Sequence, residues 1–134
     1  MKNIVLFLAI CLCFQIFSCK NETQSERFKL LTGPIWASDS LLVNGVDAGG
    51  PGGMLEKFSG DIKFNEDYTG YFGDYTGTWR FAFDETQIVI SSDSLPIPLT
   101  AVIAELNTTS LKITTSYQIP PSDPINIRMT FLAK

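Results

Sequence analysis

Short segments in which apolar and polar residues alternate follow one another along most of this 134-residue chain, and they leave few folds open. From Phe58 to Asn65, apolar side chains or glycine occupy every second position, and Trp79, Phe81 and Phe83 repeat the pattern. Successive side chains of a strand point to opposite faces, so each segment predicts a strand with one buried face.

Turn residues between these segments set the bounds of eight predicted strands. They are 35–43, 58–64, 68–74, 76–84, 87–92, 99–106, 110–117 and 125–133. Most follow one another through short turns, which predicts an all-β fold: an eight-stranded antiparallel up-and-down barrel over residues 28–134. Closure of the barrel removes the exposed edges that an open sheet must protect. A two-sheet sandwich is the alternative that the same alternation allows.

Two further segments precede or interrupt the strands. Residues 26–31 predict one or two helical turns, with Ser25 as N-cap and Gly33-Pro34 as the stop. Residues 44–53 contain five glycines and predict a mobile flap between the first two strands. The segment lacks the Gly-Lys-Ser/Thr ending of a phosphate-binding loop.

The chain begins with Lys2 and an apolar run from Ile4 to Phe17, which ends at Ser18-Cys19. The run is shorter than the ~20 apolar residues that span a membrane, and its layout is that of a secretory signal peptide. Residues 16–19 resemble a bacterial lipobox, which implies cleavage before Cys19 and acylation of that cysteine with chains such as palmitate. Two or more acyl chains anchor a protein stably.

This resemblance divides the chain into a signal peptide (1–18), a flexible tether (19–27) and the barrel domain. Residues 20–26 are polar and resemble the surface-export signal of Bacteroidetes lipoproteins, although a plain solvated linker has the same composition. We therefore expect an outer-membrane lipoprotein that faces either the periplasm or the cell surface, with its membrane contact through Cys19.

Composition excludes several classes of function. The net charge of −4, which becomes −5 when Lys2 leaves with the leader, argues against nucleic acid. The absence of histidine removes the usual general base, and Cys19 is the single cysteine after cleavage. Glu66-Asp67 has the chemistry of a turn. We predict no catalytic residues, no metal and no cofactor.

Four segments resemble the lipocalin-like lipoproteins that are common in Bacteroidetes. They are 30–36 (LLTGPIW), 62–70 (IKFNEDYTG), 75–79 (YTGTW) and 103–111 (IAELNTTSL). Lipocalins place Gly and Trp two apart on the first strand, whereas Gly33 and Trp36 are three apart. The resemblance implies one contact, in which Arg128 of the last strand lies across Trp36 and closes the barrel; a solvated Arg128 is the alternative.

The resemblance implies binding of a small apolar ligand. Candidate pocket residues are Phe64, Phe72, Trp79, Phe81, Ile103 and Met129, although aromatic residues at period two are also typical of a packed core. The alternative is a filled barrel that binds an envelope protein through exposed tyrosines, with candidates Tyr68, Tyr71, Tyr75 and Tyr117. Ser40 and Ser94 lie in Asp-Ser-Leu tripeptides that resemble the O-glycosylation motif of Bacteroidetes.

Overall fold

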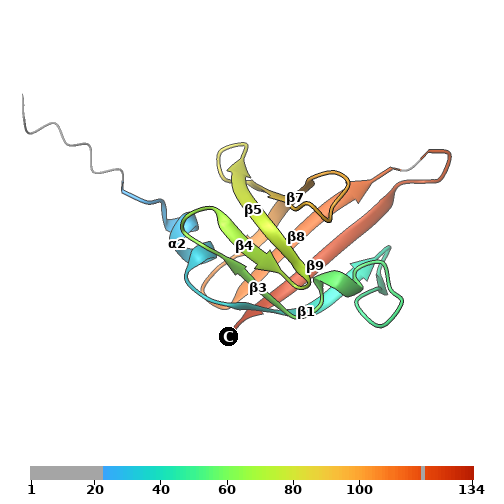
Figure 1. The fold of residues 1–134 in the computed structure, drawn as a ribbon, viewed down its shortest axis with the longest axis horizontal. Coiled ribbons are helices and arrows are strands. Elements are labelled where there is room, and N and C mark those ends of the chain that lie inside the picture. The colour runs from blue at the N-terminus through green and yellow to red at the C-terminus, as the bar shows by residue number, and fades with distance from the viewer. Residues whose placement is uncertain (1–22, 119) are drawn as a thin grey trace, which may run out of the picture.

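The computed structural model describes residues 23–118 and 120–134, so the predicted leader and Cys19 lie outside the described residues. The described part contains one α-helix, one short 3-10 helix and a single antiparallel sheet (Figure 1). In chain order the elements are α2 (Glu26–Thr32), β1 (Trp36–Val43), β2 (Val46–Asp47), η1 (Glu56–Phe58), β3 (Asp61–Phe64), β4 (Thr69–Phe72), β5 (Tyr75–Ala82), β6 (Gln87–Ser91), β7 (Leu99–Leu106), β8 (Ser110–Tyr117) and β9 (Ile125–Ala133).

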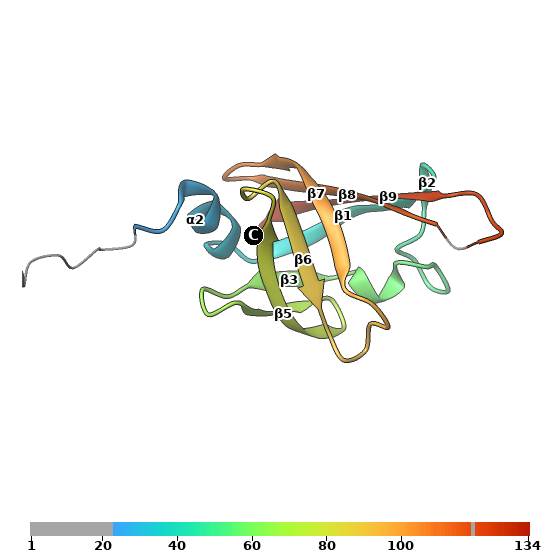
Figure 2. The same ribbon diagram turned by 90° about the horizontal axis from the view of Figure 1, so that it is seen from above.

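The sheet closes on itself, which confirms the predicted barrel. Strands β1 and β3 to β9 pair with their neighbours in order, and the pairing of β1 with β9 completes the circle. Every pairing is antiparallel, and β2 is a short extra strand on the end of β1. Figure 2 shows the barrel from above, with α2 at one end and η1 towards the other.

Strand bounds follow the alternation best in the C-terminal half. The bounds of β7, β8 and β9 are those predicted, and Ile127, Met129 and Phe131 all point into the core. The prediction is wrong at two other places. Phe58 is buried but belongs to η1 rather than to a strand. Phe83, predicted to face inward, is 76% exposed because the chain turns there with a φ of 47°.

The glycine-rich segment 44–53 was predicted to be a mobile flap, but the structure shows backbone hydrogen bonds between it and β1. β2 pairs with the end of β1 across Asn44-Gly45, whose φ angles of 50° and 81° are those of a tight two-residue hairpin. Beyond this hairpin the Ala48 N–H donates to the Leu41 carbonyl (2.8 Å). The segment therefore folds back along β1.

Helix α2 covers one end of the barrel, which we call the closed end (Figures 1 and 2). As predicted, Ser25 caps it: its hydroxyl oxygen accepts from the Phe28 N–H at 3.1 Å. Phe28 and Leu31 are buried in the barrel core because they lie on the same face of the helix. The helix starts at Glu26, so it includes the last two residues of the predicted tether, Glu26 and Arg27.

Polar contacts at both ends of α2 fix it to the barrel. The Lys63 ammonium of β3 donates to the carbonyl oxygens of Thr32, Gly33 and Pro34, where the helix ends. A cation is favourable at this end of a helix because the last carbonyls have no partner within it. At the other end of α2, the Arg27 Nε–H donates to the Glu85 carbonyl at 2.9 Å. The closed end is thus covered and hydrogen-bonded.

Candidate functional site

The six predicted pocket residues lie inside the barrel and pack against one another. Phe64, Phe72, Trp79 and Met129 are at most 2% exposed, and Phe81 and Ile103 are half-buried at the margin of the same core. The rings meet edge to face: Trp79 lies 5.5 Å from Phe64 and 5.3 Å from Phe81 between centroids. This geometry is that of a packed aromatic core.

Elements of the closed end complete this aromatic cluster. The ring of Phe28 in α2 lies 5.8 Å from Trp79, and the ring of Tyr68 in the β3–β4 turn lies 5.1 Å from it. The Trp79 indole N–H donates to the Asn65 carbonyl at 3.0 Å, so its polar atom is satisfied. Side chains therefore fill the barrel between β3, β4, β5 and α2.

The opposite end of the barrel has an apolar pocket of about 310 Å³, which we call the mouth. Four connections meet there: the segment before β3, the β4–β5 turn, the β6–β7 loop and the β8–β9 loop. Alternate connections of an up-and-down barrel lie at the same end, which is why they converge. The lining residues are Met54, Leu55, Phe58, Tyr75, Leu95, Pro96, Ile97, Leu99, Tyr117, Ile125 and Ile127.

The side chains that line the mouth are uncharged and mostly apolar. None of its lining residues is charged, and the side-chain polar groups among them are the hydroxyls of Tyr75 and Tyr117. At the rim, Met54 is 61% and Ile97 is 51% exposed. Ligand pockets in proteins have volumes of ~300–1,000 Å³ and are lined mainly by apolar side chains with a few polar groups. The mouth meets both criteria at the lower limit of size.

One wall of the mouth is fixed by η1. The Asp74 N–H of the β4–β5 turn donates to the Lys57 carbonyl at 2.8 Å. The rings of Phe58 and Tyr75 pack with their centroids 4.8 Å apart, and the Lys57 ammonium lies 6.0 Å from the Tyr75 ring. These contacts hold Tyr75 in place, with its ring on the lining of the pocket.

The structure does not bring Trp36 and Arg128 together. In the β1–β9 ladder Trp36 is opposite Ala133, whereas Arg128 is opposite Leu42. Trp36 is fully buried and its indole N–H donates to the Leu31 carbonyl at 3.0 Å, while Arg128 is exposed on the outer face. The implied closing contact is wrong for this chain, because register and strand phase separate the two side chains.

The predicted glycosylation sites and the candidate tyrosines lie in different parts of the barrel. Ser94 is exposed in the turn between β6 and β7, whereas Ser40 is half-buried within β1. Of the candidate tyrosines, Tyr75 and Tyr117 line the mouth. Tyr68 is 50% exposed, with one face against Trp79. Tyr71 is half-buried in β4.

Carboxylates near the turns bond to neighbouring groups of the same hairpin. The hydroxyl and then the backbone N–H of Thr69 donate to Asp67 and lower the pKa of its carboxyl group. The Ser110 hydroxyl, followed by the Lys112 ammonium, lowers the pKa of Glu105. Within residues 23–118 and 120–134, no group of three or more His, Cys, Asp or Glu side chains is placed to hold a metal ion.

No family model matches this chain, and no curated protein matches it. The eight-stranded antiparallel barrel is compatible with a lipocalin-like fold. None of the helices that the structure describes is long and apolar enough to cross a membrane.

Sequence reasoning missed most of the mouth. Its rim residues Met54 and Ile97 lie in glycine- and proline-bearing connections between the predicted strands, where alternation gives no inward or outward direction. A signal was present, because apolar side chains occur in alternate connections and a closed barrel brings those connections to one end. Apart from Phe83, the strand alternation identified the inward-facing residues, but it did not distinguish the filled half of the barrel from the half that contains the mouth.

Proposed function

We propose that this chain is a lipid-anchored envelope protein whose barrel binds a small apolar ligand at the mouth. The observation that supports binding is the mouth itself: an uncharged pocket with exposed apolar residues at its rim. A ligand that covers Met54 and Ile97 gains free energy in proportion to the apolar area it removes from water. The lipid anchor is supported by the lipobox-like sequence that ends at Cys19.

The position of α2 affects how an anchor at Cys19 presents the mouth. The helix packs on the closed end, opposite the mouth (Figure 2). Cys19 precedes Thr23, the first described residue, by four positions, a reach of at most about 14 Å. An acylated Cys19 would therefore hold the closed end near the bilayer, with the mouth directed away from it.

The anchor is tested by the intact mass of the protein purified from its native membrane. We expect a chain that starts at Cys19 and carries acyl chains on that residue, since both events follow from the lipobox-like sequence. A chain that still begins at Met1, or one with an unmodified thiol at Cys19, would contradict the anchoring part of the proposal. Ligand binding at the mouth does not depend on this result.

Ligand binding is tested with N-phenyl-1-naphthylamine, an uncharged apolar dye whose fluorescence rises on transfer out of water. We expect saturable binding of one dye per chain. The Ile125→Glu variant should weaken it at least ~10-fold, because a carboxylate in an uncharged pocket must be desolvated when the dye covers it. Leu132→Glu is the matched control, since Leu132 is 45% exposed on the outer face of the same strand, β9.

Two results would count against a mouth ligand. One is the absence of saturable dye binding by the wild-type protein. The other is an equal effect of the Ile125 and Leu132 substitutions while circular dichroism shows both variants folded. Capture of an envelope protein through the mouth, without dye binding, would favour the alternative of an interaction module, for which the exposed rim residues Met54 and Ile97 are the relevant observation.

A further inference from the structure

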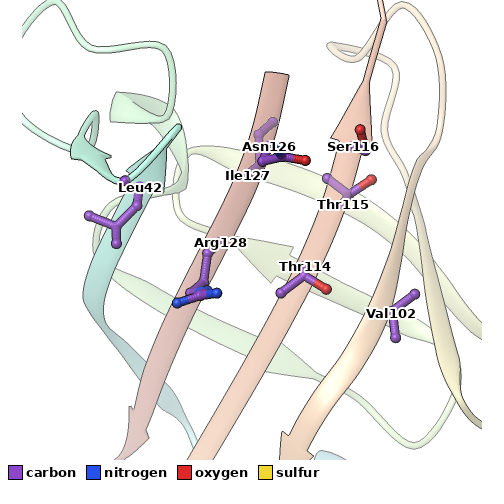
Figure 3. Close-up of a pocket in the computed structure, with 9 residues that line it drawn as sticks. Leu42, Val102, Thr114, Thr115, Ser116, Asn126, Ile127 and Arg128 are labelled. Atoms are coloured by element: carbon purple, nitrogen blue, oxygen red, sulfur yellow. The ribbon is translucent and has the colours of Figure 1, made fainter. Parts of the chain in front are cut away.

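The backbone ladder between β7 and β8 stops before it reaches the mouth. Their ladder runs from Leu106↔Leu111 to Val102↔Thr114 and stops there. Yet β7 begins at Leu99, where it still pairs with β6, and β8 continues to Tyr117, where it still pairs with β9. We call this stretch of the wall, which has no backbone ladder, the seam. Figure 3 shows Thr114 and Val102 on the two neighbouring strands.

A single side-chain hydrogen bond is described across the seam. The Thr115 hydroxyl donates to the Thr100 carbonyl at 2.8 Å. One such bond contributes only about 0.5–1.5 kcal/mol, far less than the backbone ladder that is absent here. The seam is therefore the part of the β7–β8 wall where the two strands can separate at the lowest cost in free energy.

A groove lies on the outer face of the barrel over the seam. It has a volume of about 530 Å³, and Figure 3 shows its lining side chains on β1, β9, β8 and β7. The lining residues are Leu42, Gly45, Val102, Thr114, Thr115, Ser116, Asn126, Ile127 and Arg128. Ile127 lines both the groove and the mouth, so the two spaces share this side chain.

The groove differs from the mouth in its chemistry. It contains the guanidinium of Arg128, with Thr114 beside it on the next strand and polar Ser116 and Asn126 nearby. The ion pairs described for residues 23–118 and 120–134 are Lys112–Glu105 and Lys134–Asp61, so Arg128 has no carboxylate partner among those residues. A guanidinium forms two parallel hydrogen bonds with a carboxylate, which suits it to an anionic head group.

We propose that the ligand is a single-chain amphiphile with a carboxylate head. The head binds Arg128 in the outer groove, and the acyl chain passes over Ile127 through the seam into the mouth. This inference rests on the proposed apolar ligand and adds two features, the charge of its head and the side entrance. It follows from the juxtaposition of a cation outside the wall, a stretch of wall without a backbone ladder and an uncharged pocket within.

The test compares dodecanoate with 1-dodecanol, which have the same chain length and differ in the charge of the head. Both are titrated into the protein as competitors of N-phenyl-1-naphthylamine. We expect the wild-type protein to prefer dodecanoate, and the Arg128→Gln variant to reduce the ratio of dodecanoate to dodecanol affinity about 10-fold. Arg80→Gln is the matched control, because Arg80 is also an exposed strand arginine but lies on β5, away from the groove.

The outcomes separate the two proposals. Equal affinities for the two amphiphiles, unchanged by Arg128→Gln, would overturn the head-group site while the mouth ligand stands. An equal loss of dodecanoate affinity in the Arg128 and Arg80 variants would also overturn it, since general electrostatic attraction would then account for the preference. A wild-type protein that binds neither amphiphile nor the dye would remove the mouth ligand as well.

Discussion

Replacement of Trp79 by alanine is expected to lower the free energy of unfolding by about 4 kcal/mol. The side chain is 2% exposed and lies at the centre of a cluster with Phe28, Phe64 and Phe81. Its removal leaves a cavity bounded by aromatic rings that cannot all collapse into it, and it leaves the Asn65 carbonyl without its indole donor. Because domains are stable by only about 5–15 kcal/mol, such a variant would be marginally folded.

Equilibrium unfolding in urea, followed by tyrosine fluorescence and circular dichroism, measures this loss. Phe83→Ala is the matched control on the same hairpin, because Phe83 is 76% exposed, and we expect a change within about 0.5 kcal/mol. If the Trp79 variant lost less than about 1 kcal/mol, the residue would line a space that already holds water or ligand. The original interpretation of Trp79 as a pocket residue would then be favoured over the packed core.

The sequence predicted eight strands and their order because each of them carries its own signal, although the same alternation also allowed a two-sheet sandwich. In β9 the buried residues Ile127, Met129 and Phe131 are separated by single exposed or half-exposed residues, and the same holds for β8. Period two sets which side faces inward, and short turns set the order of strands. Both are local properties of the chain, whereas the pairing of β1 with β9 that closes the barrel is a distant contact.

Local signals failed where distant contacts decide the conformation. Phe58 continues the alternation of β3, but Gly60 adopts a φ of 111° that ends strand geometry, and Phe58 packs on Tyr75 instead. The Asn44-Gly45 dipeptide lies between two valines and is a strong hairpin signal. The high glycine content of residues 44–53 nevertheless favoured the prediction of a mobile flap. The positions of β1 against β9, which separate Trp36 from Arg128, depend on how the barrel closes.

The lining residues of the mouth could be predicted from the sequence only once a closed barrel was assumed. Its residues come from the segment before β3, the β6–β7 loop and the ends of four strands far apart in the chain, and none of these parts contains a recognisable motif. The seam was not accessible to sequence reasoning, because Leu99 and Tyr117 sit within strands that alternate normally. Where the β7–β8 ladder ends depends on how neighbouring strand pairs are placed in the closed, twisted barrel, which residue pattern alone does not set.

Gly77→Ala should destabilise the barrel by about 3 kcal/mol although it adds one methyl group. A Cβ at Gly77 would lie 1.9 Å from the Ser91 carbonyl oxygen of β6. Gly77 also pairs with Gly70 of β4, where a Cβ would lie 2.3 Å from the Lys63 carbonyl oxygen. Glycines in strands mark places where backbones approach closely or bend at a barrel corner. Relief of the clash requires β5 to move away from β6, and their ladder begins at the adjacent pair Thr78↔Ser91.

The matched control is Gly50→Ala, because a Cβ there has no atom within 4 Å and the residue does not have a positive φ. That variant should be neutral or more stable by up to about 1 kcal/mol, since alanine reduces the entropy of the unfolded chain. Urea midpoints with unchanged slopes would report both effects as differences in stability. Equal midpoints for the Gly77 variant and wild type would mean that β5 and β6 tolerate a side chain between them. The close approach of the two strands would then contribute little to the closure of the barrel.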